Sequence, residues 1–370
     1  MYDQLREDTL YIMLYAAVIV VAMLATCYLL FRQGNAFAKD VTPPARLRRW
    51  TAAFFAVFVV NHVWYMGPSF FLTSSDDIKM TNLVGGLLDC MTFFPLAIVV
   101  LLCMLQDRRR PLWPVAVMVA PLIAGMAWCV ASRSDALFQM LIVYIMLMSI
   151  GLIIYMVFAL RQYGRWLRDN YADLEHKEVW QSFVVLAIIL LVFCIYVSSG
   201  EGPSYEYLLQ LIVVVLIGYL LWRVETLSDL SFLHPQSLPA DETASEVTEG
   251  DSLLPTIRDN IRELLQQHCI DAQLYLQHDL TVAQLAQAIG VNRLYLSQYF
   301  SRQGLSYNAY INDLRINHFV SLYREAVAAN RPITAKQLAQ ESGFQSYSTF
   351  SLAFKQRMGQ SVTAWMRSAD

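Results

Sequence analysis

The chain has 370 residues, of which 56% are hydrophobic and only 15% are charged, and its formal net charge is −3 at pH 7. This composition, with its positive mean hydropathy, excludes a single soluble globular domain of that length. The apolar residues are concentrated in the first 224 residues, which predicts two parts of different character.

Long apolar segments follow one another through this first part. At a rise of about 1.5 Å per residue, a helix over each segment is long enough to cross a hydrocarbon core of about 30 Å. Buried helices of a soluble protein are the alternative, but so many in succession with short charged connections favour a membrane domain. The seven predicted spans are 9–31, 50–71, 82–105, 112–131, 137–160, 179–199 and 205–223.

Basic residues are distributed unequally between the two sets of connecting loops. Loops 32–49, 106–111 and 161–178 together with Arg223 carry thirteen Lys and Arg residues, whereas the opposite side has only Arg6, Lys79 and Arg133. Because Lys and Arg stay on the cytoplasmic side during insertion, we expect the N-terminus outside and the C-terminal part in the cytoplasm. This predicts a multi-pass protein of a bacterial inner membrane. The first segment lacks a basic leader and a clear cleavage site, so it is interpreted as a span.

Three polar residues interrupt the second and third predicted spans. Antiparallel packing of these helices would bring His62, next to Asn61, to the same depth as Asp89. Polar groups inside a membrane commonly mark functional sites, so one interpretation is a site that senses a ligand or a proton. The other interpretation is a hydrogen-bonded contact between helices that fixes their register.

The segment 225–251 differs from both of its neighbours. It contains seven acidic residues, no Lys or Arg, and many Pro, Ser and Thr residues. This composition is typical of a solvated, flexible linker, with an end-to-end distance of roughly 25 to 30 Å. The predicted organisation is therefore a membrane domain at 1–224, a linker at 225–251 and a C-terminal domain at 252–370.

A motif is repeated within the C-terminal domain, as TVAQLAQAIG at 281–290 and TAKQLAQESG at 334–343. Each copy has a Thr followed three residues later by Gln, which predicts a capping box, and each ends in a glycine that permits a left-handed turn. A second amphipathic helix follows, anchored by Leu296 and Phe300 in the first copy and by Phe350 and Phe354 in the second. Two short helices joined by a tight turn are typical of DNA-binding hairpins.

These motifs resemble the AraC/XylS-type transcription regulators over about 110 residues. The resemblance is carried by LTVAQLAQAIGVNRLYLSQYF, GLSYNAYINDLRI and ITAKQLAQESGFQSYSTFSLAFKQRMG, in the family's order. It implies two helix-turn-helix units bridged by a long helix, double-stranded DNA as the ligand and RNA polymerase as an expected partner. The chain departs from the family pattern in a shorter Phe300–Gly304 interval, at Phe319 where a small residue is common, and at Val362 where proline is usual.

Outward positions near the start of the two recognition helices are the predicted base contacts, as the matching positions are in the family. They are Arg293, Leu294, Ser297 and Gln298 in the first unit, and Gln345, Tyr347, Ser348, Ser351 and Leu352 in the second. Arg side chains suit guanine and Gln side chains suit adenine, while an apolar side chain suits the thymine methyl group. Three further basic residues, Arg302, Lys355 and Arg357, are predicted to contact phosphates.

The sequence as a whole predicts an all-α protein in which a seven-helix membrane domain precedes an all-helical DNA-binding domain. We favour a one-component regulator whose membrane domain receives an unidentified signal, with a homodimer formed in the membrane as a hypothesis for signal transmission. The alternative is a DNA-binding protein that the membrane helices only anchor or dock to a partner. A membrane enzyme or transporter is disfavoured, because no catalytic constellation, metal-ligand spacing or cofactor motif is visible, and lipid is the only other expected partner.

Overall fold

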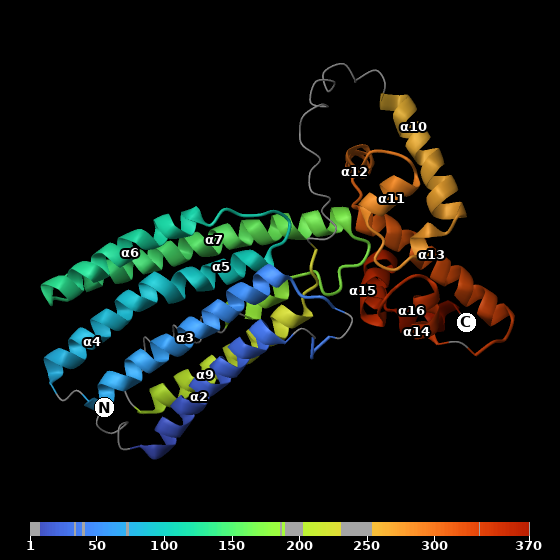
Figure 1. The fold of residues 1–370 in the computed structure, drawn as a ribbon. Helices are drawn as coiled ribbons and strands as arrows, with labels where there is room; N and C mark the ends of the chain where they lie inside the picture. The colour runs from blue at the N-terminus through green and yellow to red at the C-terminus, as the bar shows by residue number, and fades with distance from the viewer. Residues whose placement is uncertain are drawn as a thin grey trace. The chain divides into compact units, whose positions relative to one another are not determined.

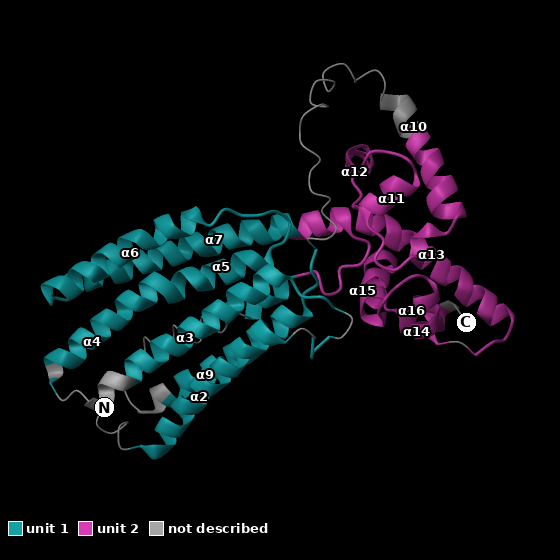
Figure 2. Ribbon diagram, in the orientation of Figure 1, with its two compact units in different colours: residues 1–163, 179–234 teal, residues 164–178, 235–370 magenta. Residues whose placement is uncertain are grey.

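The computed structural model describes residues 8–32, 35–38, 41–71, 74–185, 187–188, 203–230, 254–332 and 334–369. Every regular element in these ranges is a helix, which confirms the predicted all-α fold. The chain divides into two compact units (Figure 2). Unit 1 comprises Met1–Tyr163 and Val179–His234, and unit 2 comprises Gly164–Glu178 and Pro235–Asp370.

The helices of unit 1 lie side by side as an elongated bundle (Figure 1). Helix α3 contacts α2, α4, α5 and α9, and α6 contacts α4 and α5. The π-helical turn η1 joins α4 directly to α5. The described elements are α2 (Thr9–Phe31), α3 (Ala45–Phe71), α4 (Ser75–Leu88), η1 (Asp89–Phe93), α5 (Phe94–Met104), α6 (Trp113–Ser132), α7 (Phe138–Asn170) and α9 (Pro203–Thr226).

Five helices in the described part of the chain are long and apolar enough to cross a membrane: Thr9–Phe31, Asp76–Met104, Trp113–Ser132, Phe138–Asn170 and Tyr207–Thr226. Helix α3 is not among them; it begins with arginines and carries Asn61 and His62 along its length. The expected span 179–199 is described only in part, as helical residues at 180–185 and 187–188, and the rest lies outside the described residues. The number of seven spans and their orientation therefore stay predictions.

Helix α7 is longer than the sequence indicated. The predicted span ended at residue 160 and a loop was expected over 161–178, but the helix continues to Asn170. Its extension is amphipathic: Tyr163 and Leu167 are buried while Arg165 and Arg168 are exposed. Because this pattern has helical spacing, the chain stays helical beyond the apolar segment. The last seven residues of α7 belong to unit 2.

The start of the predicted linker is part of unit 1. Glu225 lies in the last turn of α9, and its side chain is fully buried in an ion pair with Arg48, whose Nε lies 2.9 Å from Glu225 Oε1. Tyr28 Oη donates to the other carboxylate oxygen at 3.2 Å. Farther along, Gln106 donates to the carbonyl of Ser228 and accepts from the backbone of Leu230. A buried carboxylate needs such partners, so Glu225, the first acidic residue of the predicted linker, is part of the packed bundle. Residues 231–251 lie outside the described residues.

Unit 2 contains two hydrophobic cores that share one long helix, α13 (Tyr307–Ala328). Tyr307 and Ile311 near its start belong to the first core, and Phe319 and Tyr323 near its end belong to the second. The other elements are α10 (Leu254–Leu265), η3 (Gln266–Asp271), η4 (Leu274–Leu276), α11 (Val282–Ala288), α12 (Arg293–Arg302), α14 (Ala335–Glu341), α15 (Tyr347–Met358) and α16 (Val362–Ala369). The bridging helix expected from the sequence is therefore present.

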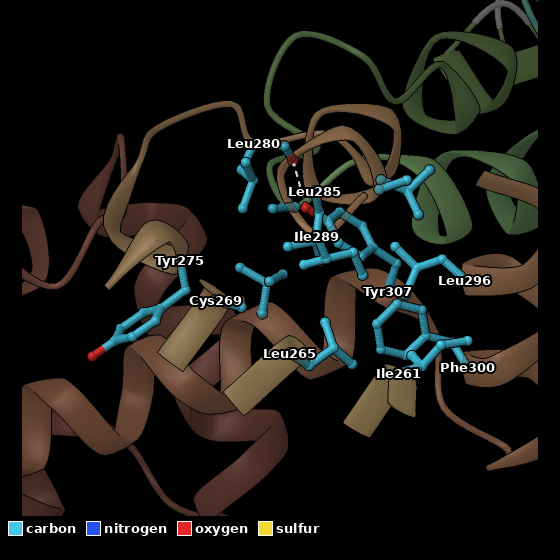
Figure 3. Close-up of a cluster of buried hydrophobic side chains, with 14 residues drawn as sticks. Ile261, Leu265, Cys269, Tyr275, Leu280, Leu285, Ile289, Leu296, Phe300 and Tyr307 are labelled. Carbon is cyan, nitrogen blue, oxygen red and sulfur yellow. Dashed lines mark hydrogen bonds between the residues drawn. The ribbon is translucent and has the colours of Figure 1, made fainter. Parts of the chain in front are cut away.

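In the first core, side chains from α10, α11 and α12 converge on the start of α13 (Figure 3). Tyr307 Oη donates to the carbonyl of Leu280 at 3.1 Å, so the polar end of this buried ring has a partner. In the second core, Phe319 is fully buried and packs against Phe350, with ring centroids 4.5 Å apart. The large residue that departs from the family pattern thus fills the core between α13 and α15.

Candidate nucleic-acid interface

Both repeats form the capping boxes that their sequences predict. In the first, Thr281 Oγ1 accepts from the backbone of Gln284 at 3.2 Å, and the Gln284 side chain accepts from the backbone of Thr281 at 2.8 Å. In the second, Thr334 and Gln337 make the same reciprocal pair at 3.3 Å each. These bonds satisfy donors that a helix N-terminus leaves open, so α11 and α14 begin at fixed residues.

The turns after α11 and α14 both pass through a glycine in the left-handed region, with φ of 70° at Gly290 and 89° at Gly343. The second turn is one residue longer, because α12 is capped by Asn292, two residues after its glycine, and α15 by Ser346, three residues after. The extra residue is the exposed Gln345. The recognition helices therefore correspond at an offset of 54 residues, whereas the first helices correspond at 53.

Alanine at Gly343 should destabilise the domain more than alanine at Gly290. Both substitutions force a left-handed residue, at a cost of about 1 to 2 kcal/mol. At Gly343 a Cβ would also lie 2.8 Å from the Cα and carbonyl oxygen of Leu276, while a Cβ at Gly290 would have no described neighbour within 4 Å. We therefore expect Gly343→Ala to lower the free energy of unfolding by about 1 to 3 kcal/mol more than Gly290→Ala does. Hydrogen exchange of α14 and α11 amides in the purified protein measures this, and equal losses of protection would contradict the close approach to η4.

Arg315, at the middle of α13, connects the two helix-turn-helix units. Its side chain is 1% exposed, and it donates from Nε to the carbonyl of Tyr275 and from Nη2 to that of Gln277, both at 2.7 Å. Its guanidinium also lies 5.6 Å from the ring centroid of Phe344, in the turn of the second unit. Burial lowers the pKa of Arg315 from its usual range. The family resemblance did not assign a role to Arg315. The sequence indicates the residue only as an arginine within an otherwise amphipathic helix.

In the first recognition helix, α12, the side chains of Leu296 and Phe300 are buried in the core, as predicted, and the remaining side chains are exposed or half-buried. Leu294 is 59% exposed and Gln298 is also exposed. Arg293 and Ser297 are half-buried. The Arg293 side chain is engaged, because its Nη2 donates to Asn170 Oδ1.

The second recognition helix, α15, repeats this arrangement with Phe350 and Phe354 fully buried. Of the five predicted base contacts in this unit, Gln345, Ser348 and Leu352 are exposed, and Tyr347 and Ser351 are half-buried. At the structural offset of 54 residues, Leu294 corresponds to Ser348 and Gln298 to Leu352. Both helices thus leave their second and sixth residues exposed and their first and fifth residues half-buried, and the base contacts stay predictions.

The three predicted phosphate contacts differ in their surroundings. Arg302 in the last turn of α12 and Lys355 on α15 are exposed. Arg357 pairs instead with Asp313 of α13, with Arg357 Nε 2.9 Å from Asp313 Oδ1. Because both members of this pair are substantially exposed, the pair contributes little stability and leaves Arg357 able to exchange Asp313 for a phosphate.

In unit 1, the polar residues of α3 and η1 form a hydrogen-bonded cluster. Asn61 Nδ2 donates to Asp89 Oδ1 and Tyr65 Oη donates to Asp89 Oδ2, both at 2.7 Å. The predicted pairing of His62 with Asp89 is wrong in this respect: the His62 ring packs against Phe58 and Tyr15, with centroids 3.9 and 4.8 Å apart. Asn61 and Tyr65 are four residues apart and share a helix face, whereas His62 lies about 100° around the helix from Asn61.

Gly85 in α4 makes room for the Tyr65 ring of this cluster. A Cβ there would lie 2.6 Å from two ring carbons of Tyr65, whereas a Cβ at Gly151 in α7 would meet no atom of the residues that the structure describes within 4 Å. Gly85→Ala is expected to displace Tyr65 from Asp89 and to cost about 1 to 3 kcal/mol. The melting temperature of the detergent-solubilised protein should fall for Gly85→Ala and not for Gly151→Ala. A similar melting temperature for both variants would show that the hydrogen bond does not stabilise the bundle.

Residues 262–368 match the family model of a helix-turn-helix domain. The match begins within α10 and ends within α16, so it includes both capping boxes, both turns and the bridging helix. Comparisons of the chain with curated proteins and with solved structures found no match.

Proposed function

The C-terminal region is an AraC-type helix-turn-helix domain, which supports a DNA-binding transcription regulator, and from this premise we propose that the chain is a membrane-tethered regulator. In this proposal the domain recognises specific double-stranded DNA through α12 and α15. The observation that carries it is the pair of complete helix-turn-helix units, whose recognition helices bury their fourth and eighth residues and leave their first, second, fifth and sixth residues exposed or half-buried. Regulators of this type are typically not enzymes, and we propose no catalytic activity.

The membrane tether is supported by the five long apolar helices of unit 1. Large apolar side chains on α7, such as Ile150, Ile153 and Phe158, are each more than half exposed, as suits a surface that lipid covers. The excess of Lys and Arg in alternate loops supports an orientation, which we propose, with the N-terminus outside and the DNA-binding domain in the cytoplasm. Lipid, RNA polymerase and a second copy of the chain are the proposed partners.

We propose further that the membrane domain receives a signal, with Asn61, His62 and Asp89 as candidate site residues. One observation favours the alternative, in which the helices are only an anchor: each carboxylate oxygen of Asp89 already has a donor from α3. A contact of this kind fixes the register of two helices without a ligand. The two functions are distinguished by whether expression of target genes depends on an added stimulus, and whether Asp89→Asn abolishes that dependence while the protein still inserts.

Chromatin immunoprecipitation and sequencing of the tagged full-length protein tests the proposed function. The control variant combines Arg293→Ala with Gln298→Ala, which removes two exposed or half-exposed polar groups from α12 and leaves its buried face unchanged. We expect discrete peaks that the control loses, while both proteins fractionate with the membrane. Reproducible peaks that persist in the control would contradict the assigned reading surface. The absence of peaks in both would mean that binding requires a stimulus or release from the membrane, or that the chain is not a regulator.

A further inference from the structure

A short acidic segment between α7 and the next membrane helix is buried in the DNA-binding domain. Residues 164–178 belong to unit 2, although 56 residues separate them from its other part, which starts at Pro235. Within the segment, Asn170, Tyr171, Ala172, Asp173 and Lys177 are each at most 9% exposed. A connecting loop is normally solvated, because its backbone polar groups need partners. Here the partners are residues of the helix-turn-helix domain.

The segment joins the domain where the first unit begins. Tyr171 and Thr281 form an antiparallel bridge, and the backbone of Ala172 donates to the carbonyl of Leu280 at 3.1 Å. From α13, Asn308 Nδ2 donates to the carbonyl of Ala172 at 2.6 Å. Ala172 itself is 1% exposed and belongs to the first hydrophobic core. Backbone pairing, a side-chain hydrogen bond and burial in the hydrophobic core thus all attach Tyr171 and Ala172 to the domain.

Charged groups hold the end of the segment. Lys177 Nζ lies 2.8 Å from Asp279 Oδ1, and the lysine side chain is only 8% exposed. Burial raises the pKa of Asp173, and its carboxylate favours the charged form of the buried Arg315 that connects the two units. The segment therefore adds compensating charge to the centre of the domain.

The same segment contacts both recognition helices near their N-termini. Asn170 Oδ1 accepts from Arg293, the first residue of α12, and Glu175 Oε2 accepts from Thr349 Oγ1, the third residue of α15, at 3.4 Å. Residues 169–178 carry four carboxylates and one lysine. An acidic segment at these positions presents oxygen acceptors to Arg293, a predicted base contact, and to Thr349, which adjoins the predicted base contact Ser348.

We propose that residues 170–178 and DNA compete for the recognition helices, so that the docked segment holds the domain in a state with low affinity for DNA. This inference rests on the proposed DNA-binding function. Because the segment continues directly from α7, a change in the membrane helices that withdraws it frees Arg293 and Thr349. The occupant of the surface is a part of the same chain, and the signal acts by releasing it.

Docking is tested without DNA by hydrogen exchange of the full-length protein in lipid nanodiscs. Lys177→Asp places like charges at the Lys177–Asp279 pair, and the double variant Lys177→Asp with Asp279→Lys restores the attraction in reverse. We expect at least about tenfold faster exchange of the 171–178 amides in the single variant, and recovery in the double variant. Fast exchange in the unmodified protein would overturn docking. Unchanged protection of the α13 amides shows that the single variant is folded.

Competition is tested with a pool of random 40-base-pair duplexes at fixed ionic strength. Lys177→Asp is expected to bind the pool about tenfold more tightly than the unmodified protein, and the double variant to return toward it, because apparent affinity scales with the fraction of competent protein. Added duplex should also accelerate exchange of 171–178 in the unmodified protein. Equal, measurable binding by all three proteins overturns the competition alone. Absence of binding in all three, with the segment released, overturns the proposed function and the competition together.

Discussion

Arg315→Met should destabilise the C-terminal domain by about 3 to 5 kcal/mol, which is a large part of the stability of a typical domain. The substitution keeps an unbranched side chain of helix-forming type but removes two charge-assisted hydrogen bonds, each worth about 1.5 to 3 kcal/mol. The carbonyls of Tyr275 and Gln277 would lose their donors. Both helix-turn-helix units should loosen, because the guanidinium connects α13 to η4 and approaches Phe344.

Hydrogen exchange of the purified full-length protein measures this effect, since each 1.4 kcal/mol of lost stability speeds the exchange of globally protected amides about tenfold. Arg324→Met is the matched control, because Arg324 lies on the same helix and is exposed. We expect exchange of the α13 and α14 amides to be more than about 100-fold faster in Arg315→Met and nearly unchanged in Arg324→Met. Similar exchange in the two variants would mean that Arg315 contributes no net stability.

Removing Arg293 and Gln298 together should weaken binding to a specific DNA site by about 30-fold to 10⁴-fold. Each good contact between a side chain and a base edge is worth about 1 to 3 kcal/mol, and the two residues lie on the exposed or half-exposed side of α12. The double alanine variant retains the buried Leu296 and Phe300, so the helix itself should persist. Loss of sequence preference should accompany the loss of affinity.

Lys355→Ala provides the contrast for this experiment. A contact to phosphate adds affinity without sequence information, so this variant should weaken binding to specific and random duplexes alike and lower the slope of log affinity against log salt by about 1. Titrations of site-bearing and scrambled duplexes at several salt concentrations separate the two behaviours. If the Arg293 and Gln298 substitutions weaken binding to both duplexes equally, these residues do not read bases.

Much of the C-terminal domain follows from local sequence. Thr281 with Gln284, and Thr334 with Gln337, determine where two helices begin, and Gly290 and Gly343 determine where the chain turns. Each pattern involves residues within about four positions of one another, so it can be recognised in the sequence without knowledge of the tertiary structure. The buried anchors Leu296, Phe300, Phe350 and Phe354 were predicted for the same reason, from helical spacing.

Contacts between residues far apart in the chain could not be predicted from the sequence in this way. Asn61 rather than His62 lies against Asp89 because the rotation of α3 toward η1 depends on the packing of the whole bundle. Glu225 has the composition of a linker residue, yet it is buried because Arg48 lies beside it. Asn308 bonds to Ala172 across 136 positions of the chain, and no pattern in either segment indicates that pair.

The sequence by itself determined the helical fold, the paired helix-turn-helix units and the buried anchors of their recognition helices. These features arise from hydrophobic periodicity and capping, which act over a few residues. Only the tertiary structure decided which polar groups meet: Arg315 with the carbonyls of η4 and its neighbour, and residues 170–178 with both recognition helices. The reason is that a polar side chain buried by folding takes whichever partner the packing of distant segments brings within hydrogen-bond distance.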